Sequence, residues 1–234
     1  MSVDTSHFSI EFFPPRTPAG EEKLDAVHGK LAALGPEFFS VTYGAGGSTR
    51  ELTQEAAQTL RKTSGLKVAA HLTCTDQSRA DVLRVAERYK ASGISDIVAL
   101  RGDASEGGAF TPHADGFENS VALIEALSRL GGFTIRVGAY PDSHPDAASM
   151  AQNIDWLKAK IDAGAHEAIT QFFFEADTFL RFRDACADDG ITAPITPGIL
   201  PISNWAIAKA FAQRCGTPVP ADVATSFERA TRDD

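Results

Sequence analysis

Polar and ionisable side chains recur near the ends of short apolar runs in this sequence. Glu11 interrupts the run FSIEFF, whose other residues favour a buried strand, and Pro14 and Pro15 end it. If the ends of such runs meet on one face of a fold, their polar residues can bind a large ligand or exchange protons with it. The other polar residues at these ends are Thr42, Tyr43, His71, Thr73, Arg101, Asp103, Tyr140, His144 and Gln171.

Each of these residues also has an ordinary structural explanation. A single carboxylate such as Glu11 can cap a helix or pair with a cation, and a single histidine such as His71 is often a hydrogen-bonded structural residue. The segment LRGD, which ends at Asp103, could be an arginine–aspartate pair that closes a turn. A functional interpretation therefore requires that all of these polar residues lie together on one face of the fold.

The residue types narrow the chemistry. No lysine lies inside the apolar runs, which argues against a Schiff-base enzyme, and the absence of H-x-H and H-E-x-x-H gives a metal site weak support. Glu11 and Asp103 could form a glycosidase pair, but the two tryptophans offer little surface for stacking sugars. A cofactor enzyme fits better, because there the protein supplies orientation and electrostatics. A metal-dependent lyase or hydrolase that uses Glu11, His71 and Asp103 is a lower-ranked hypothesis.

The polar residues listed above must be positioned by seven apolar runs. Each run is followed by a turn and an amphipathic stretch. Their starts lie about 30 residues apart, which suits one strand and one crossover helix per unit and predicts a parallel sheet covered by helices. No G-x-G-x-x-G follows the first run, so an α/β (β/α)₈ TIM barrel is favoured over a doubly wound sheet. The predicted strands cover residues 8–13, 38–44, 68–74, 96–102, 134–140, 167–174 and 194–200.

Helical patterns fill the stretches between the strands. Apolar residues repeat at helical spacing between Leu24 and Leu34, and two S-x-x-E/D capping boxes are predicted at 48–51 and 78–81. The polar tail after residue 215 contains no eighth strand pattern. We therefore expect one barrel domain over residues 1–234 from which the eighth strand and last helix are missing.

The composition excludes several classes of protein. The chain has 234 residues and a formal net charge of −9, which argues against nucleic-acid binding by phosphate neutralisation. Three cysteines without a CxxC spacing argue against a disulfide framework or a zinc site. No signal-peptide pattern occurs, and no apolar run approaches the roughly 18 residues of a spanning helix. We expect a cytoplasmic protein with no membrane partner.

Eight segments together resemble one family. They are SIEFFPPRT (9–17), VTYGAGGSTR (41–50), HLTC (71–74), ALRGD (99–103), AYPDSHPDA (139–147), KAKIDAGA (158–165), ITQFFF (169–174) and PGILPISN (197–204). In this order they are similar to methylenetetrahydrofolate reductases, in particular to the bacterial single-domain form. The resemblance runs from about residue 8 to the end of the chain and implies a barrel that binds FAD non-covalently.

The resemblance also implies a reaction and its residues. NAD(P)H would reduce the flavin, and the reduced flavin would convert 5,10-methylenetetrahydrofolate to 5-methyltetrahydrofolate in a ping-pong sequence. Glu11 matches the family's general acid, and Asp103 matches the aspartate near pterin and flavin. Gln171 and Phe211 match residues that contact folate and the nicotinamide nucleotide. From its strand-end position among aromatic residues, we expect burial to raise the pKa of Glu11.

The flavin contacts implied by the resemblance come from several strand ends. Arg101 and Lys160 would supply positive charge for the pyrophosphate. Three positions before Lys160 depart from the family pattern, which puts contacts to the adenosine half in doubt; they are Asn153, Trp156 and Ala159. The implied cofactor-binding residues are Thr42, Tyr43, Ala45, His71, Arg101, Gly102, Asp103, Tyr140, His144, Ala147 and Lys160.

Three further points stay open in the sequence. The expected missing end, which would normally carry a folate-binding arginine, makes a truncated, non-catalytic chain that binds FAD or a partner the alternative hypothesis. The sequence contains no identifiable residue that would recognise the ribose phosphate of NADPH, so it does not distinguish NADH from NADPH as the donor. The bacterial family forms dimers and tetramers, and we expect a homo-oligomer.

Overall fold

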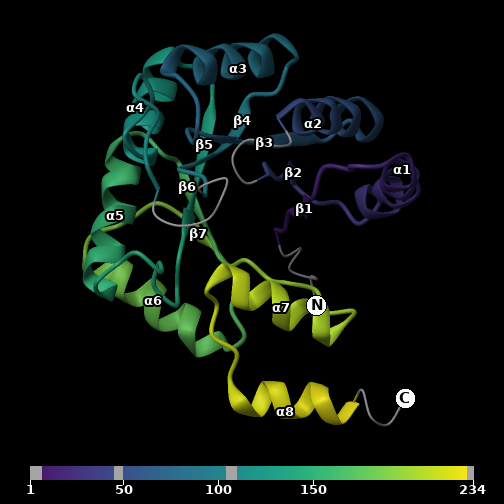
Figure 1. The fold of residues 1–234 in the computed structure, drawn as a ribbon, viewed down its shortest axis with the longest axis vertical. Coiled ribbons are helices and arrows are strands. Elements are labelled where there is room, and N and C mark those ends of the chain that lie inside the picture. The colour runs from purple at the N-terminus through teal and green to yellow at the C-terminus, as the bar shows by residue number, and fades with distance from the viewer. Residues whose placement is uncertain (1–6, 45–49, 104–109, 231–234) are drawn as a thin grey trace, which may run out of the picture. The chain divides into compact units, whose positions relative to one another are not determined.

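The computed structural model describes residues 7–44, 50–103 and 110–230 (Figure 1). The chain divides into two compact units, Met1–Arg136 and Val137–Asp234. Strand β5 (Thr134–Ala139) runs through the boundary between them. Each unit is described by itself.

The strands of the first unit form a parallel sheet in chain order. β1 (Ile10–Phe12), β2 (Phe38–Val41), β3 (Lys67–Thr73) and β4 (Asp96–Leu100) pair successively. The start of β5 joins β4, because the Thr134 amide donates to the carbonyl of Ser95 over 2.8 Å. All four residues of β2 are buried, as are all residues of β3 after the exposed Lys67. Such continuous burial indicates strands covered on both faces.

The second unit continues the same strand order. The amide of Gln171, just after β6 (Glu167–Thr170), donates to the carbonyl of Ala139 in β5 over 2.8 Å. β6 in turn pairs in parallel with β7 (Ile195–Thr196). The order is therefore β1-β2-β3-β4-β5-β6-β7, which confirms all seven predicted strands as one parallel α/β fold. The predicted absence of an eighth strand and a last helix stays a prediction.

Eight helices occur among the described residues. In the first unit α2 and α3 turn small and aliphatic faces to the core, including Leu60 and Val82, and Tyr89 of α3 is also fully buried. No described helix is long and apolar enough to cross a bilayer. The helices are α1 (Pro18–Ala32), α2 (Arg50–Ser64), α3 (Arg79–Ala91), α4 (Ser120–Leu130), α5 (Met150–Asp162), α6 (Ala176–Asp188), α7 (Trp205–Cys215) and α8 (Ala221–Ala230).

Local sequence signals explain several helix ends. The helix start predicted at 78–81 is confirmed with Ser78 as N-cap, because the Ser78 hydroxyl accepts from the Asp81 amide over 3.2 Å at the start of α3. Ser48 of the other predicted box lies outside the described residues. The periodic pattern that ends at Leu34 overestimates its helix: α1 ends at Ala32, contains no buried residue, and leaves Leu34 64% exposed.

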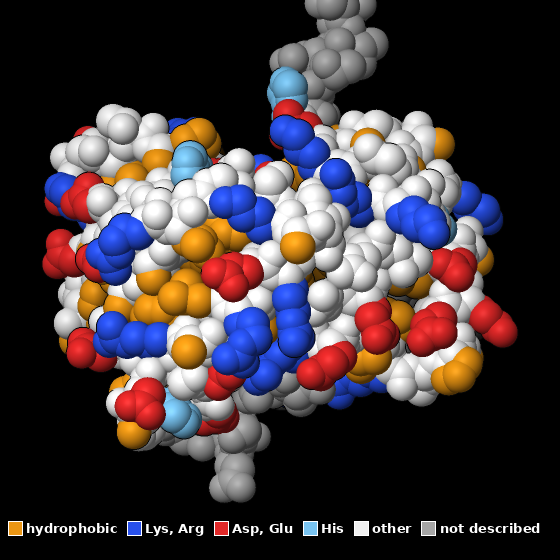
Figure 2. Space-filling model, turned by 90° about the horizontal axis from the view of Figure 1, so that it is seen from above, with side chains coloured by type: hydrophobic (Ala, Val, Ile, Leu, Met, Phe, Trp, Pro, Cys, Tyr) orange, Lys and Arg blue, Asp and Glu red, His pale blue; other side chains and the backbone are white. Residues whose placement is uncertain are grey.

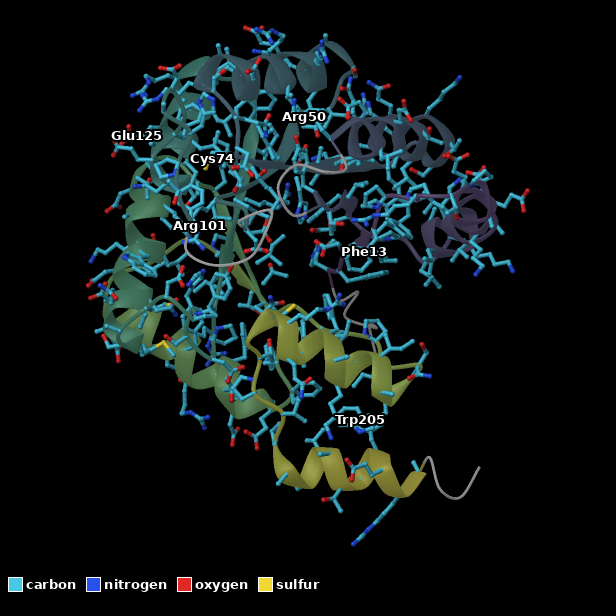
Figure 3. The ribbon with its side chains drawn as sticks, viewed as in Figure 1. Phe13, Arg50, Cys74, Arg101, Glu125 and Trp205 are labelled. Carbon is cyan, nitrogen blue, oxygen red and sulfur yellow. The ribbon has the colours of Figure 1, made fainter. Side chains whose placement is uncertain are left out.

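Aromatic packing joins the last two helices of the second unit. The ring of Trp205, at the start of α7, stacks on Phe227 of α8 with centroids 4.7 Å apart. Figure 3 shows Trp205 between these two helices. Gly216 ends α7 in the left-handed region with φ of 69°, where a side chain would be strained.

Acidic and basic side chains are interspersed over the face that Figure 2 shows.

Candidate active site

Strand register places a polar row on one face of the first unit's sheet. Glu11 of β1 lies directly opposite Ser40 of β2, and Ser40 lies opposite Ala69 of β3. Because side chains alternate along a strand, His71 and Thr73 share the face of Ala69. Glu11, Ser40 and His71 therefore meet near the C-terminal ends of three adjacent strands.

Two hydrogen bonds fix the Glu11 carboxylate. Its Oε2 lies 3.1 Å from Nε2 of His71 and accepts from the Ser40 hydroxyl over 3.2 Å. Ser40 and His71 are buried, while the Glu11 side chain is 51% exposed. Burial raises the pKa of Glu11, but the hydrogen bond and charge of His71 and the hydroxyl of Ser40 together lower that pKa below its usual value. The expectation of a raised pKa in an apolar surrounding is therefore wrong.

The end of β2 is held by a backbone bond to β1 and by side chains of α2. The Thr42 amide donates to the Phe12 carbonyl over 2.9 Å, and the Thr42 carbonyl accepts from the Thr53 hydroxyl over 2.9 Å. Nε of Arg50 donates to the Tyr43 hydroxyl over 3.2 Å. Burial raises the pKa of that hydroxyl, although the charge of Arg50 opposes the rise. Ala45, a predicted flavin contact, lies outside the described residues.

The end of β4 is fixed through the Arg101 carbonyl. It accepts from the Thr75 hydroxyl over 2.8 Å, from the Cys74 amide over 3.2 Å and from the Cys74 thiol over 3.3 Å. Figure 3 shows Cys74 and Arg101 at the ends of neighbouring strands. Gly102 has φ of +87°, and a Cβ there would lie 2.3 Å from Oγ1 of Thr75. Asp103, the predicted catalytic aspartate, follows at once and is exposed.

Two side-chain features at these ends are suited to a ligand. The Arg101 guanidinium is half-buried and lies 5.0 Å from the centroid of the Phe110 ring. The hydroxyl of Thr73 is buried, and no described residue forms a hydrogen bond with it. Because buried polar groups are almost always paired, a bound molecule or water is the expected partner of this hydroxyl.

The second unit gathers the predicted contacts that follow β5. The rings of Tyr140 and His144 pack edge to face with centroids 4.5 Å apart, and His144 packs on Trp156 at 5.8 Å. The buried Asn153 side chain donates to the Tyr140 carbonyl over 2.7 Å and accepts from the His144 amide over 3.3 Å. Asn153, which the sequence left in doubt as a cofactor contact, thus holds the segment that carries Tyr140 and His144.

Lys160 and Ala147 lie beside the same segment of the second unit. Nζ of Lys160 donates to the Gly138 carbonyl of β5 over 2.9 Å, so this half-buried ammonium lies beside the strand end. The Ala147 amide donates to the His144 carbonyl over 2.9 Å, which closes a turn. Ala159, another position of doubt, is half-buried in α5.

Gln171 and Phe211, the predicted substrate contacts, are linked through Phe172. Oε1 of Gln171 accepts from the Phe172 amide over 3.1 Å. The Phe172 ring stacks on Phe211 of α7 with centroids 5.5 Å apart. Gln171 and Phe211 are both half-buried. The second unit thus places an amide and an aromatic ring of the predicted type around one buried phenylalanine.

Sequence reasoning did not find the positioning role of three residues, of which it had named only Asn153, as a doubtful cofactor contact. They are Ser40, Thr75 and Asn153, whose partners are Glu11, Arg101 and the Tyr140–His144 segment respectively. The available signal was weak: Ser40 is a lone hydroxyl inside the apolar run FFSV. Within residues 7–44, 50–103 and 110–230, no group of three or more His, Cys, Asp or Glu side chains could hold a metal ion.

A family model describes residues 2–234 as methylenetetrahydrofolate reductase. The chain belongs to the methylenetetrahydrofolate reductase family. It is 45% identical to the 5,10-methylenetetrahydrofolate reductase of Pectobacterium carotovorum over 94% of this chain and 72% of that protein. The enzyme of the same name from Escherichia coli K12 is 42% identical over 94% of this chain and 73% of its own length. The family is one of oxidoreductases that act in folate one-carbon metabolism.

Two other proteins match this chain in different ways. One is a longer plant protein that aligns over part of its length, and the other is similar in fold. Methylenetetrahydrofolate reductase (NADH) 1 of Arabidopsis thaliana is 37% identical, with 94% of this chain and 39% of that protein aligned. A Clostridium thermocellum protein that binds two copies of 5-methyl-5,6,7,8-tetrahydrofolic acid has a TM-score of 0.65 at 14% identity. The alignment covers 96% of this chain and 76% of that one, and at this identity it establishes similarity of fold.

Proposed function

We propose that this chain reduces 5,10-methylenetetrahydrofolate to 5-methyltetrahydrofolate with NAD(P)H, through non-covalently bound FAD in a ping-pong sequence. The observation that carries the proposal is Glu11, a family-matched carboxylate held by His71 and Ser40 at the end of β1. A cytoplasmic location and a homo-oligomeric state belong to the same proposal.

Each unit, taken by itself, has residues at its strand ends that suit part of a flavin dinucleotide. Thr73 offers a buried hydroxyl without a partner among the described residues, and Arg101 and Lys160 offer half-buried cations suited to phosphate. FAD, when bound, supplies the redox chemistry, which is acceptance of hydride from NAD(P)H and donation of hydride to the folate. The other proposed contacts are Thr42, Tyr43, Ala45, His71, Gly102 and Asp103 in the first unit and Tyr140, His144 and Ala147 in the second.

Glu11 is the proposed proton donor to N10 of the folate, directly or through water. Protonation of N10 breaks its bond to the bridging methylene carbon and leaves an iminium cation at N5, which accepts the hydride. The lowered pKa means that Glu11 is ionised near neutral pH in the free protein. It must therefore take up a proton when folate binds, and exclusion of water by the ligand favours that uptake because desolvation disfavours the carboxylate.

Asp103 is proposed to stabilise this cation by its charge. The same charge disfavours reduction of a nearby flavin, so Asp103→Asn should raise the reduction potential of bound FAD and slow folate reduction. Spectroelectrochemical titration of both proteins measures the difference. An unchanged potential would place Asp103 away from the flavin.

Gln171 and Phe211 are the proposed substrate contacts. Oε1 of Gln171 is used by the Phe172 amide, which leaves its NH₂ group to orient a bound folate or nicotinamide. Phe211, whose ring stacks on Phe172 and lies 5.5 Å from the Arg214 guanidinium, is proposed to pack on a planar ligand.

The decisive experiment follows the two half-reactions of the purified chain. We expect FAD uptake, bleaching of the flavin by NADH or NADPH without oxygen, and its reoxidation by 5,10-methylenetetrahydrofolate. A folded chain that takes up no FAD contradicts the proposal. FAD uptake without folate turnover would instead favour the non-catalytic chain that binds FAD or a partner.

A further inference from the structure

The contacts of Glu11 are unequally divided between its two carboxylate oxygens. Both the Ser40 hydroxyl and Nε2 of His71 bind Oε2. No hydrogen bond from a described residue reaches Oε1. A carboxylate held in this way has one anchored oxygen and one oxygen available to a ligand.

Ser40 and His71 are well placed to act as fixed anchors. Ser40 is 3% exposed and pairs directly with Glu11 in the β1–β2 register. His71 is 7% exposed, and its own carbonyl accepts from the Tyr89 hydroxyl over 3.3 Å. Short side chains on buried strands have few alternative rotamers, so they hold a partner more firmly than long side chains on the surface do.

We infer that Ser40, with His71, holds Oε2 of Glu11 and thereby presents Oε1 to the substrate, which makes Ser40 a positioning residue. The inference rests on the proposed function for the identity of the substrate, a reduced folate. The anchoring itself depends only on the three side chains of the first unit. Ser40 has no proton-transfer role, because its hydroxyl donates to the carboxylate and Glu11 carries the proton.

The electrostatic surroundings of Glu11 are simple enough to test this assignment. Of the described titratable groups, His71 from β3 is the one whose charge acts on Glu11, and β2 contributes the uncharged Ser40. A hydrogen bond to the ionised form lowers the pKa of a carboxyl, so removing the Ser40 hydroxyl must raise the pKa of Glu11. A serine that only fills space in the core would leave that pKa where it is.

The experiment is a pH titration of protein labelled with ¹³C at the glutamate carboxyls, with the Glu11 signal identified by its loss in Glu11→Gln. We expect the pKa of Glu11 to rise in Ser40→Ala and to stay near wild type in Ser40→Thr, which keeps the hydroxyl. Ser120→Ala is the matched control, because Ser120 is another buried serine of the first unit and has no bond to a carboxylate. A Ser40→Ala protein that folds with an unchanged Glu11 pKa overturns the inference.

Rapid kinetics of the flavin-loaded protein adds a second readout. The pH at which folate reduction declines should move upward in Ser40→Ala by the shift seen for Glu11, while flavin reduction by NAD(P)H keeps its rate. At low pH, where Glu11 is protonated in both proteins, we expect Ser40→Ala to be about tenfold slower with folate because the acid is less well oriented. Equal losses in both half-reactions would indicate a structural role and overturn the inference.

Two outcomes separate this inference from the proposed function. A raised Glu11 pKa in Ser40→Ala supports the anchoring even if the wild-type chain takes up no FAD, a result that would contradict only the proposed function. If Ser40→Ala does not fold, the wild-type titration still decides, since a Glu11 pKa at or above that of an ordinary glutamate contradicts the anchoring.

Discussion

The side-chain hydroxyl of Thr75 donates a 2.8 Å hydrogen bond to the backbone carbonyl of Arg101. This bond ties the loop after β3 to the end of β4, directly before Gly102 and the proposed electrostatic residue Asp103. The orientation of the Arg101 and Asp103 side chains therefore depends on Thr75. No role in the proposed reaction is assigned to Thr75 itself.

Replacing Thr75 by valine should loosen the Arg101–Asp103 segment. Valine keeps the shape but not the donor, and a bond of this kind contributes about 1 kcal/mol net. We expect a fall of roughly that size in the free energy of unfolding and a several-fold weaker FAD affinity, measured by denaturation and fluorescence titration. Thr75→Ser should retain both properties; a valine variant equal to wild type would show that the Cys74 donors suffice.

Gly102→Ala should be destabilising. The added Cβ would meet Oγ1 of Thr75 at 2.3 Å, and φ of +87° is unfavourable for any side chain. The expected loss is about 1–3 kcal/mol, measured by urea denaturation. Gly29→Ala in α1 is the control: nothing lies within 4 Å of the added atom, so the change should be neutral or slightly stabilising. Similar losses at both glycines would argue against this account.

The depressed pKa of Glu11 predicts a specific loss of stability in acid. The folded-state pKa lies below that of the unfolded chain, so the contribution is present above the ordinary glutamate pKa and disappears as pH falls through the folded value. Glu11→Gln should therefore show a weaker decline of unfolding free energy at acid pH than wild type. A Glu11→Gln curve that coincides with that of wild type over the acid range would contradict the prediction.

The buried pair formed by Arg136 and Asp96 should be sensitive to loss of one member. Nη1 of Arg136 lies 2.6 Å from Oδ1 of Asp96, and its guanidinium lies 4.0 Å from the centroid of the Phe38 ring. Asp96→Asn removes the negative charge that Asp96 places beside this buried cation, and breaking a buried ion pair typically costs about 3–5 kcal/mol. Arg129→Met, which removes an exposed pair with Glu125, should cost at most about 1 kcal/mol. Denaturation experiments in which Asp96→Asn and Arg129→Met lose equal free energy of unfolding would contradict the prediction.

The three cysteines should differ in reactivity. Burial raises the pKa of the Cys74 and Cys186 thiols to about 11, so few thiolates form near neutral pH. Cys215 is half-buried. We expect one thiol, that of Cys215, to react with a disulfide reagent in the native protein and all three to react after unfolding. Mass-spectrometric mapping of the first labelled site checks this, and early labelling of Cys74 would contradict it.

Much of the fold was predictable because its signals are local. Continuous apolar runs such as VAAHLTC and a capping box such as Ser78–Asp81 depend on neighbouring residues, and the structure contains the corresponding strand and helix start. Strand lengths were less predictable: the run at 167–174 contains a strand only over Glu167–Thr170. Residues 171–174, with the sequence QFFF, are mainly apolar but lie beyond the end of this strand.

The sequence by itself determined that Glu11 lies within one apolar strand and His71 within another, because these are properties of short contiguous segments. The tertiary structure alone decided which way the Glu11 pKa moves. That direction depends on Ser40 and His71, which lie 29 and 60 residues away along the chain. Parallel pairing of β1, β2 and β3 brings Ser40 and His71 to one oxygen of the carboxylate, where their hydrogen bonds and the charge of His71 together outweigh the effect of burial.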